Sequence, residues 1–140
     1  MPAKDLFHDA VKIALQKDGW IVLRENFRVQ VDEEGLALFV DLAAQKLISA
    51  EKNGRKIAVE VKNFQEESNI YQFHAALGQY LNYRSGLREV MPDYTMYLAI
   101  PLEIHREFFQ LKFIQKRIEE HDLKLLVFRP DTEEIVLWRT

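Results

Sequence analysis

The clearest alternation of apolar and polar residues in this chain runs over residues 56–62, where it predicts a half-buried β-strand. The apolar positions are Ile57, Val59 and Val61, and the positions between them are Ala58, Glu60 and Lys62. Because side chains alternate between the two faces of a strand, one face is apolar and the other carries a carboxylate and an ammonium group two residues apart. The Asn53-Gly54 pair before this strand predicts a tight hairpin.

Apolar residues at helical spacing predict three helices, over residues 5–18, 69–85 and 101–120. Ser68 is the expected N-cap of the second helix and Gly86 its stop, and Pro101 opens the third. Ile104, Phe108, Leu111 and Ile118 are expected to face the core from the third helix. Short apolar runs predict strands over residues 20–23, with a continuation through 27–31, and over 36–50, 56–64, 93–100, 123–128 and 135–138.

The predicted order of elements is α-β-β-β-α-β-α-β-β. A meander of three strands followed by a helix and a fourth strand requires a crossover connection, which is typical of parallel neighbours. We therefore predict an α/β (α+β) fold with a central mixed sheet flanked by helices. The 140 residues are expected to form one domain over 1–140.

The composition of the chain limits the classes of protein to which it can belong. The chain is 48% hydrophobic and 29% charged, as expected of an ordinary globular protein. It contains no cysteine, which excludes disulfides and thiolate zinc sites. The first residues lack the apolar segment of a signal peptide, and no apolar run is long enough to span a membrane, so we expect a cytoplasmic protein without membrane contact. A net charge of −3 argues against strong non-specific binding to nucleic acid, although charge can be segregated on a surface.

Two carboxylates and one lysine form the candidate site. Asp41 ends the apolar run over residues 36–40, and Glu60 and Lys62 share one face of the strand that follows. Two carboxylates suit a hard divalent cation such as Mg²⁺, with Mn²⁺ as a substitute, so Asp41 and Glu60 are the predicted metal ligands. A lysine beside the metal can orient an attacking water and offset charge that develops on a phosphate. The pattern thus predicts metal-dependent hydrolysis of phosphodiester bonds.

The hairpin register conflicts with this site. A two-residue turn at Asn53-Gly54 pairs positions whose numbers sum to 107, which sets Asp41 opposite Glu66. Asp41 then lies four residues beyond the position opposite Lys62, which is roughly 13 Å along a strand. We therefore expect a longer loop, a bulge between Ala43 and Arg55, or strong curvature of the sheet.

Other interpretations of the polar residues remain open. A Glu-x-Lys pattern alone is also typical of a solvent-facing strand. The four histidines lack the spacing of a structural zinc site, and His8 is interpreted as solvated or hydrogen-bonded within the fold. His105, Lys112 and Lys116 share a predicted helix face that is interpreted as solvated rather than phosphate-binding.

The spelling Asp41-x18-Glu60-x-Lys62 resembles the PD-(D/E)-x-K motif of the restriction-endonuclease-like nucleases. Val40 stands where that motif has proline, which performs no chemistry. Gln79-Tyr80 resembles the glutamine that several of these families carry on the helix after the Glu-x-Lys strand, with Tyr83 on the same helix face. The resemblance implies a restriction-endonuclease-like fold and adds Gln79 to Asp41, Glu60 and Lys62 as catalytic candidates.

Longer sequence segments resemble those of the XisH family, the cyanobacterial fdxN-element excision controlling factors, over essentially the whole chain. These are Lys4-Asp-Leu-Phe-His8-Asp-Ala-Val-Lys12, Lys17-Asp-Gly-Trp20, Phe39-Val-Asp-Leu-Ala-Ala44, Ile57-Ala-Val-Glu-Val-Lys-Asn-Phe64 and Gln79-Tyr-Leu-Asn-Tyr-Arg84. The resemblance implies an accessory factor for site-specific excision of a DNA element by a recombinase, and a companion protein of the XisI type. We expect a stable oligomer, either a homodimer or a complex with that companion. Two functions stay open: an accessory factor that contacts DNA or protein, and a Mg²⁺-dependent DNA endonuclease.

Overall fold

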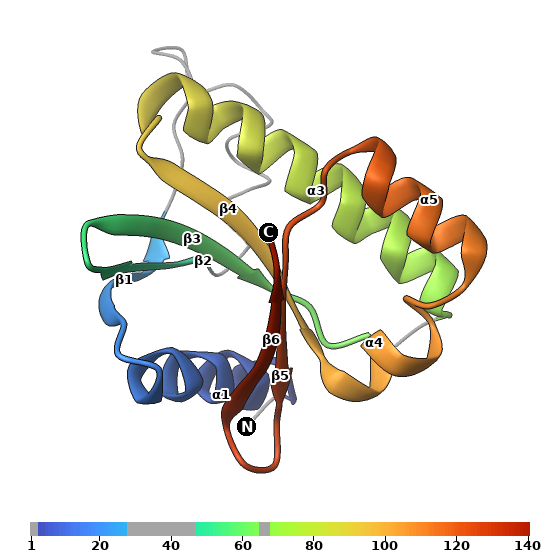
Figure 1. The fold of residues 1–140 in the computed structure, drawn as a ribbon, viewed down its shortest axis with the longest axis horizontal. Helices are drawn as coiled ribbons and strands as arrows, with labels where there is room; N and C mark the ends of the chain where they lie inside the picture. The colour runs from blue at the N-terminus through green and yellow to red at the C-terminus, as the bar shows by residue number, and fades with distance from the viewer. Residues whose placement is uncertain (1–2, 28–46, 65–67) are drawn as a thin grey trace.

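Helices and a single sheet make up the structure, a computed structural model that describes residues 3–27, 47–64 and 68–140 (Figure 1). The helices are α1 (Ala3–Lys17), α3 (Asn69–Val90), α4 (Leu102–Glu107) and α5 (Lys112–Glu120). The strands are β1 (Ile21–Phe27), β2 (Leu47–Lys52), β3 (Arg55–Val61), β4 (Tyr94–Pro101), β5 (Leu125–Arg129) and β6 (Glu134–Arg139). Within the described ranges, none of the helices combines the length and apolar character that crossing a bilayer requires.

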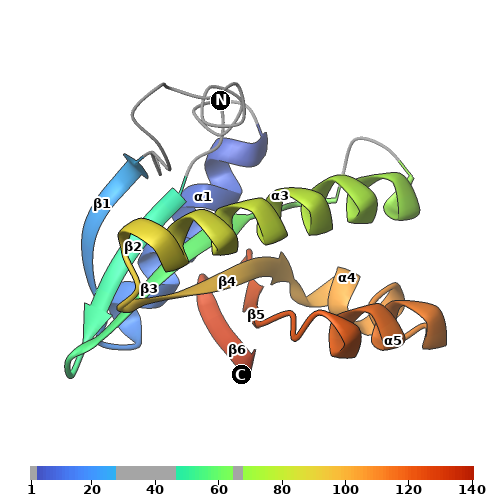
Figure 2. The same ribbon diagram turned by 90° about the horizontal axis from the view of Figure 1, so that it is seen from above.

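The six strands lie in sequence order, β1 to β6, in one mixed sheet. β1, β2 and β3 are antiparallel neighbours, as are β5 and β6, whereas β3–β4 and β4–β5 are parallel pairs. Each parallel pair needs a crossover, and α3 supplies the first, while α4 and α5 supply the second (Figure 2). The predicted mixed sheet with flanking helices is confirmed.

The sheet separates two apolar cores. On one face α1 packs through Val11 and Leu15 against Ile57 and Val59 of β3. On the other face α3, α4 and α5 cover the sheet, so Ala58 of β3 is also fully buried. Because β3 lies in the interior of the sheet between covered faces, its middle residues are buried on both sides.

The hairpin between β2 and β3 has the predicted two-residue turn. Asn53 and Gly54 both have positive φ angles, 52° and 81°, as a type I′ turn requires. The register runs unbroken from Lys52 opposite Arg55 to Leu47 opposite Glu60, so the predicted sum of 107 is confirmed. The expected longer loop is therefore wrong, and no bulge interrupts the pair from residue 47 onward. The remainder of the predicted strand 36–50, including Asp41, lies outside the described residues.

A matched pair of glycine substitutions tests this turn. Gly54→Ala should lower the free energy of unfolding by about 1–2 kcal/mol, because an L residue is strained at positive φ, although a Cβ there would meet no atom within 4 Å. Gly78→Ala, in the helical backbone of α3 and equally uncrowded, should instead raise it by about 0.5–1 kcal/mol. Urea denaturation of the two variants measures both changes, and a stabilised Gly54→Ala protein would contradict the turn assignment.

The single helix predicted over 101–120 is wrong, because the chain forms α4 and α5 with a break at residues 108–111. Phe108 and Phe109, two neighbouring residues in this break, are both buried. The break turns both rings toward Phe64 and Phe73, with ring centroids 5.6–6.3 Å apart. Leu111, predicted to face the core, is instead 53% exposed.

Helix α3 continues through Gly86, so the predicted stop there is wrong. Gly86 and Leu87 are both buried within the helix, which runs on to Val90. Met91, which precedes Pro92, leaves the helical conformation, as expected before proline. The predicted N-cap is confirmed, since the Ser68 side chain accepts a hydrogen bond from the Tyr71 backbone N–H at 3.3 Å.

Candidate functional site

The carboxylate of Glu60 lies in the interior, on the face of β3 that α3 covers. The residue is 1% exposed, near the end of the strand, between Leu47 of β2 and Leu98 of β4 in the sheet. Burial raises its pKa to about 8, and the nearby charge of Lys62 opposes that rise only partly. Among the described residues, neither carboxylate oxygen has a hydrogen-bond partner. A buried carboxyl group without partners is costly, so its retention calls for an explanation.

Lys62 follows β3 directly, where the predicted strand was longer. The strand ends at Val61, but the Lys62 backbone N–H still donates to the Ala99 carbonyl of β4 at 3.0 Å. The half-buried Lys62 side chain lies close enough for its charge to lower the pKa of Glu60. The predicted neighbourhood of Glu60 and Lys62 is therefore present.

Helix α3 brings two further polar groups, Gln79 and Tyr83, which lie four residues apart on one helix face. The Oε1 atom of Gln79 is buried, and no described residue bonds to it. Tyr83 is fully buried, and its pKa is raised above the ordinary range by burial and, to a lesser extent, by the charge of Glu60. Tyr83 therefore belongs to the surroundings of Glu60, a role that the sequence hinted at only by its spacing from Gln79.

Asp41, the second predicted ligand, lies outside the described residues, so the predicted approach of its carboxylate to Glu60 stays a prediction. Within residues 3–27, 47–64 and 68–140, no three histidine, aspartate or glutamate residues are grouped in a way that could hold a metal ion. The described part of the site provides one carboxyl group without a described hydrogen-bond partner and one ammonium group. The approach of Gln79 to these groups stays a prediction.

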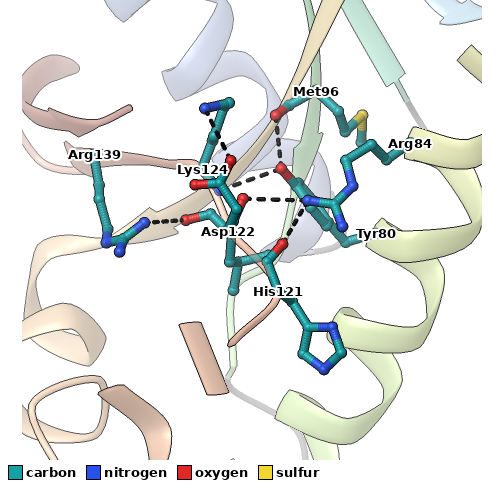
Figure 3. A network of polar contacts seen from close by, with 8 residues as sticks. Tyr80, Arg84, Met96, His121, Asp122, Lys124 and Arg139 are labelled. Atoms are coloured by element: carbon teal, nitrogen blue, oxygen red, sulfur yellow. Dashed lines mark hydrogen bonds and ion pairs between the residues drawn. The ribbon is translucent and has the colours of Figure 1, made fainter. Parts of the chain in front are cut away.

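A polar network fixes α3 against the sheet (Figure 3). The Tyr80 hydroxyl donates to the Met96 carbonyl of β4 at 2.9 Å and accepts from the Lys124 backbone N–H at 3.2 Å. Arg84 lies over the Tyr80 ring at 5.3 Å and donates to the carbonyl of His121. Because β4 is the neighbour of β3, these bonds help to hold α3, and with it Tyr83, over the face of the sheet that carries Glu60.

Removal of the Tyr80 hydroxyl should lower the stability of the protein by a measurable amount. Tyr80→Phe keeps the ring but leaves the Met96 carbonyl and the Lys124 N–H without a buried partner, so the free energy of unfolding should fall by about 1–3 kcal/mol. Thermal or urea denaturation measures the loss. Tyr71→Phe, at a position 59% exposed on the same helix, is the control and should change stability little; equal losses in the two variants would contradict the network's role.

The histidines do not build a second site within the described residues. His8 is buried, and its Nε2 atom lies 3.0 Å from Oε1 of Glu25, whose other oxygen accepts from Lys12 at 2.9 Å. These bonds tie α1 to β1, which agrees with the interpretation of His8 as hydrogen-bonded within the fold. The predicted helix face of His105, Lys112 and Lys116 is wrong, because His105 lies on α4 and both lysines lie on α5.

Comparisons with known proteins give one consistent relationship. A family model described as XisH protein matches residues 1–136. An XisH family protein from Nostoc punctiforme PCC 73102, solved by crystallography, is 44% identical, with a TM-score of 0.87 over 97% of this chain and 100% of that one. The crystal structure of an fdxN element excision controlling factor protein from Anabaena variabilis gives the same identity and TM-score, over 97% and 99%. The curated proteins contain no match to the chain.

Proposed function

Because the chain belongs to the XisH family, we propose that it acts as a controlling factor in the site-specific excision of a DNA element. The Anabaena variabilis protein, 44% identical over nearly its whole length, is named an fdxN element excision controlling factor, and that name supports the proposal. The proposed partners are DNA, a recombinase and an XisI-type companion protein, with a homodimer as the alternative assembly, in the cytoplasm. The mixed sheet serves in this proposal as a single restriction-endonuclease-like domain that contains the Glu60 site.

The observation that carries the proposal is the orphaned carboxylate of Glu60. Both oxygens are buried and have no hydrogen-bond partner among the described residues. Such a group destabilises the fold unless a ligand that binds the native state compensates for it. Lys62 alone does not compensate, since the pKa of Glu60 stays raised despite the lysine's charge. A cationic ligand at this position is therefore the simplest reason for the acid.

Mg²⁺ or Mn²⁺ fits this donor set. Hard divalent cations take carboxylate oxygens as ligands and keep several waters, so Glu60 would supply one protein ligand and Asp41 the second. Such a cation, when bound, polarises a phosphoryl oxygen and acidifies a bound water. The chain's own residues would then do the positioning: Lys62 offsets negative charge on a DNA phosphate, and Gln79 offers a side-chain amide from α3.

A second candidate function, a Mg²⁺-dependent DNA endonuclease, is favoured by the placement of Lys62 beside Glu60. A lysine at that place can orient the water that attacks phosphorus and stabilise the charge that develops there. An accessory factor needs no group that orients an attacking water, because it does not cleave the DNA that it binds. A nuclease fold can nevertheless keep a site of this kind for binding after cleavage is lost.

Incubation of supercoiled plasmid carrying the ends of an excised element separates the two functions. The purified chain, with and without the companion protein, is tested for DNA binding and for nicking, in Mg²⁺ and in EDTA. Binding that depends on Mg²⁺ and on Glu60, without nicking, supports the accessory factor, and Mg²⁺-dependent nicking supports the endonuclease. Neither binding nor nicking under any of these conditions would contradict both.

A further inference from the structure

A cavity lies at the far end of β3 from Glu60. It has a volume of about 420 Å³ and is formed where the end of α1, the β2–β3 turn and the end of β6 meet. Its lining comprises Asp18, Trp20, Lys52, Asn53, Arg55, Trp138 and Thr140. Arg55 and Glu60 are five residues apart along the strand, roughly 16 Å, and Trp20 belongs to the core on the α1 face. The cavity is therefore separate from the Glu60 site.

Aromatic rings form one wall of this cavity. The chain has two tryptophans, and both contribute to the lining although they are 118 residues apart in sequence. Their ring centroids lie 5.7 Å apart at an interplanar angle of 39°. Trp20 is held by a hydrogen bond from its Nε1 atom to Oδ2 of Asp18, and Trp138 packs edge-on against Tyr97. The half-buried Trp138 ring offers a preorganised surface on which a planar ligand can stack.

Cationic side chains stand beside these rings. Lys52 is bound to Asp18, through the Asp18 carbonyl and through the carboxylate at 3.6 Å. Gly19 makes room for that lysine, because a Cβ there would lie 3.3 Å from Lys52 Cε. Arg55 is exposed, with its guanidinium 5.9 Å from the Trp20 ring centroid, and no carboxylate in the described part of the chain pairs with it. Its five N–H donors remain available for an anion.

We propose that this cavity binds a nucleotide unit, with the base stacked on the tryptophan wall and the phosphate held by Arg55. The combination is specific to that chemistry: indole surfaces stack with bases of any identity, and a planar guanidinium binds phosphate oxygens in pairs. Two sources supply such a unit, a free mononucleotide and the terminal nucleotide of a DNA single strand. The proposal does not depend on a metal at Glu60.

The two tryptophans report directly on this site. In isotope-labelled protein, the indole N–H groups of Trp20 and Trp138 give the chain's two indole signals in a nitrogen–proton correlation spectrum. The probes are deoxyadenosine monophosphate, a short 5′-phosphorylated oligodeoxyadenylate, the same strand without its phosphate, and inorganic phosphate. We expect saturable shifts of both indole signals with the first or second probe and far weaker shifts with the last two.

Variants connect those shifts to the named residues. Arg55→Ala should weaken nucleotide affinity about tenfold, the effect of losing one charge-assisted contact, while unchanged backbone signals of residues far from the cavity show that the fold is retained. Arg88→Ala, an equal change of charge at an exposed position on α3, should leave affinity unchanged. If the phosphorylated strand binds more tightly than deoxyadenosine monophosphate, a DNA end is the source of the nucleotide unit. If the two probes bind equally, the source is a free nucleotide. Indole signals that respond equally to inorganic phosphate, or to no probe, or an Arg55→Ala protein that binds as wild type, would overturn the proposal.

Discussion

Protein freed of divalent cations is expected to lose stability as the pH rises from about 5 to 8, and Glu60→Gln is expected to abolish most of that loss. The physical reason is the buried Glu60 carboxyl, whose pKa is raised to about 8 in the folded chain from an ordinary value of 4.5. Between these two pH values the unfolded chain has released the proton while the folded chain retains it. The unfolded state therefore binds fewer protons, and the free energy of unfolding falls as the pH rises.

The size of this loss in stability follows from the pKa values of Glu60 in the folded and in the unfolded chain. Each pH unit between them costs roughly 1.4 kcal/mol, so the full loss approaches 4–5 kcal/mol, an upper bound for a buried group. Below about pH 4.5 and above about pH 8 the contribution of Glu60 no longer changes with pH. At alkaline pH the amide variant should be the more stable protein, since it buries no titrating acid.

Urea denaturation across this pH range, in EDTA, gives the measurement. Other titrating groups contribute equally to wild type and variant, so the difference between the two profiles isolates Glu60. Glu119→Gln, an exposed position on α5, is the control and should follow wild type. Parallel profiles for wild type and Glu60→Gln would show that Glu60 is not a buried, destabilised acid.

Lys62→Ala is expected to lower any Mg²⁺-dependent DNA cleavage by about 10²–10³-fold, the cost of losing one group that stabilises charge in the transition state. Metal affinity should change little, because the ammonium group is not a ligand. The result follows from the placement of Lys62 beside Glu60 and from the endonuclease function proposed for the site.

Lys56→Ala is the matched control for that variant. Lys56 lies at the other end of the same strand, on the same face, with its ammonium 5.9 Å from the Tyr94 ring. Single-turnover cleavage of a plasmid, with metal binding measured separately, compares the two lysines. An equal loss of cleavage in both variants would indicate a general electrostatic effect on DNA binding, and retained cleavage in Lys62→Ala would remove this lysine from the chemistry.

Much of this fold could be predicted from residues that are close together in the sequence. The Asn53-Gly54 hairpin and the Ser68 cap each depend on a few adjacent residues, and the structure agrees with both. The described register follows the simple count from that turn, and not the longer loop that we expected. The resemblance to the XisH family is confirmed by the family match. The helix predictions failed where distant contacts decide the conformation: Phe108 and Phe109 break a helix to reach Phe64 and Phe73, and no local pattern contains that information.

The candidate site, like the fold, could be predicted only as far as adjacent residues determine it. Alternation placed Glu60 and Lys62 on one face of a strand, but it could not tell a solvent-facing side from a buried one. The outcome depends on α3, which covers that face and brings Tyr83 toward Glu60 from a separate part of the chain. The burial of Glu60 is thus a tertiary property, and it turns a commonplace sequence pattern into a candidate metal site.

Calorimetric titration of Mn²⁺ into wild type and Glu60→Gln at neutral pH, repeated in two buffers of different ionisation enthalpy, tests the central claim most directly. Because Glu60 is protonated in the folded protein at that pH, a cation that binds its carboxylate must displace the proton. We predict binding by wild type with release of about one proton per metal ion, and loss of most of the affinity in Glu60→Gln. Identical titrations of the two proteins, or binding without proton release, would contradict a divalent-cation site at Glu60.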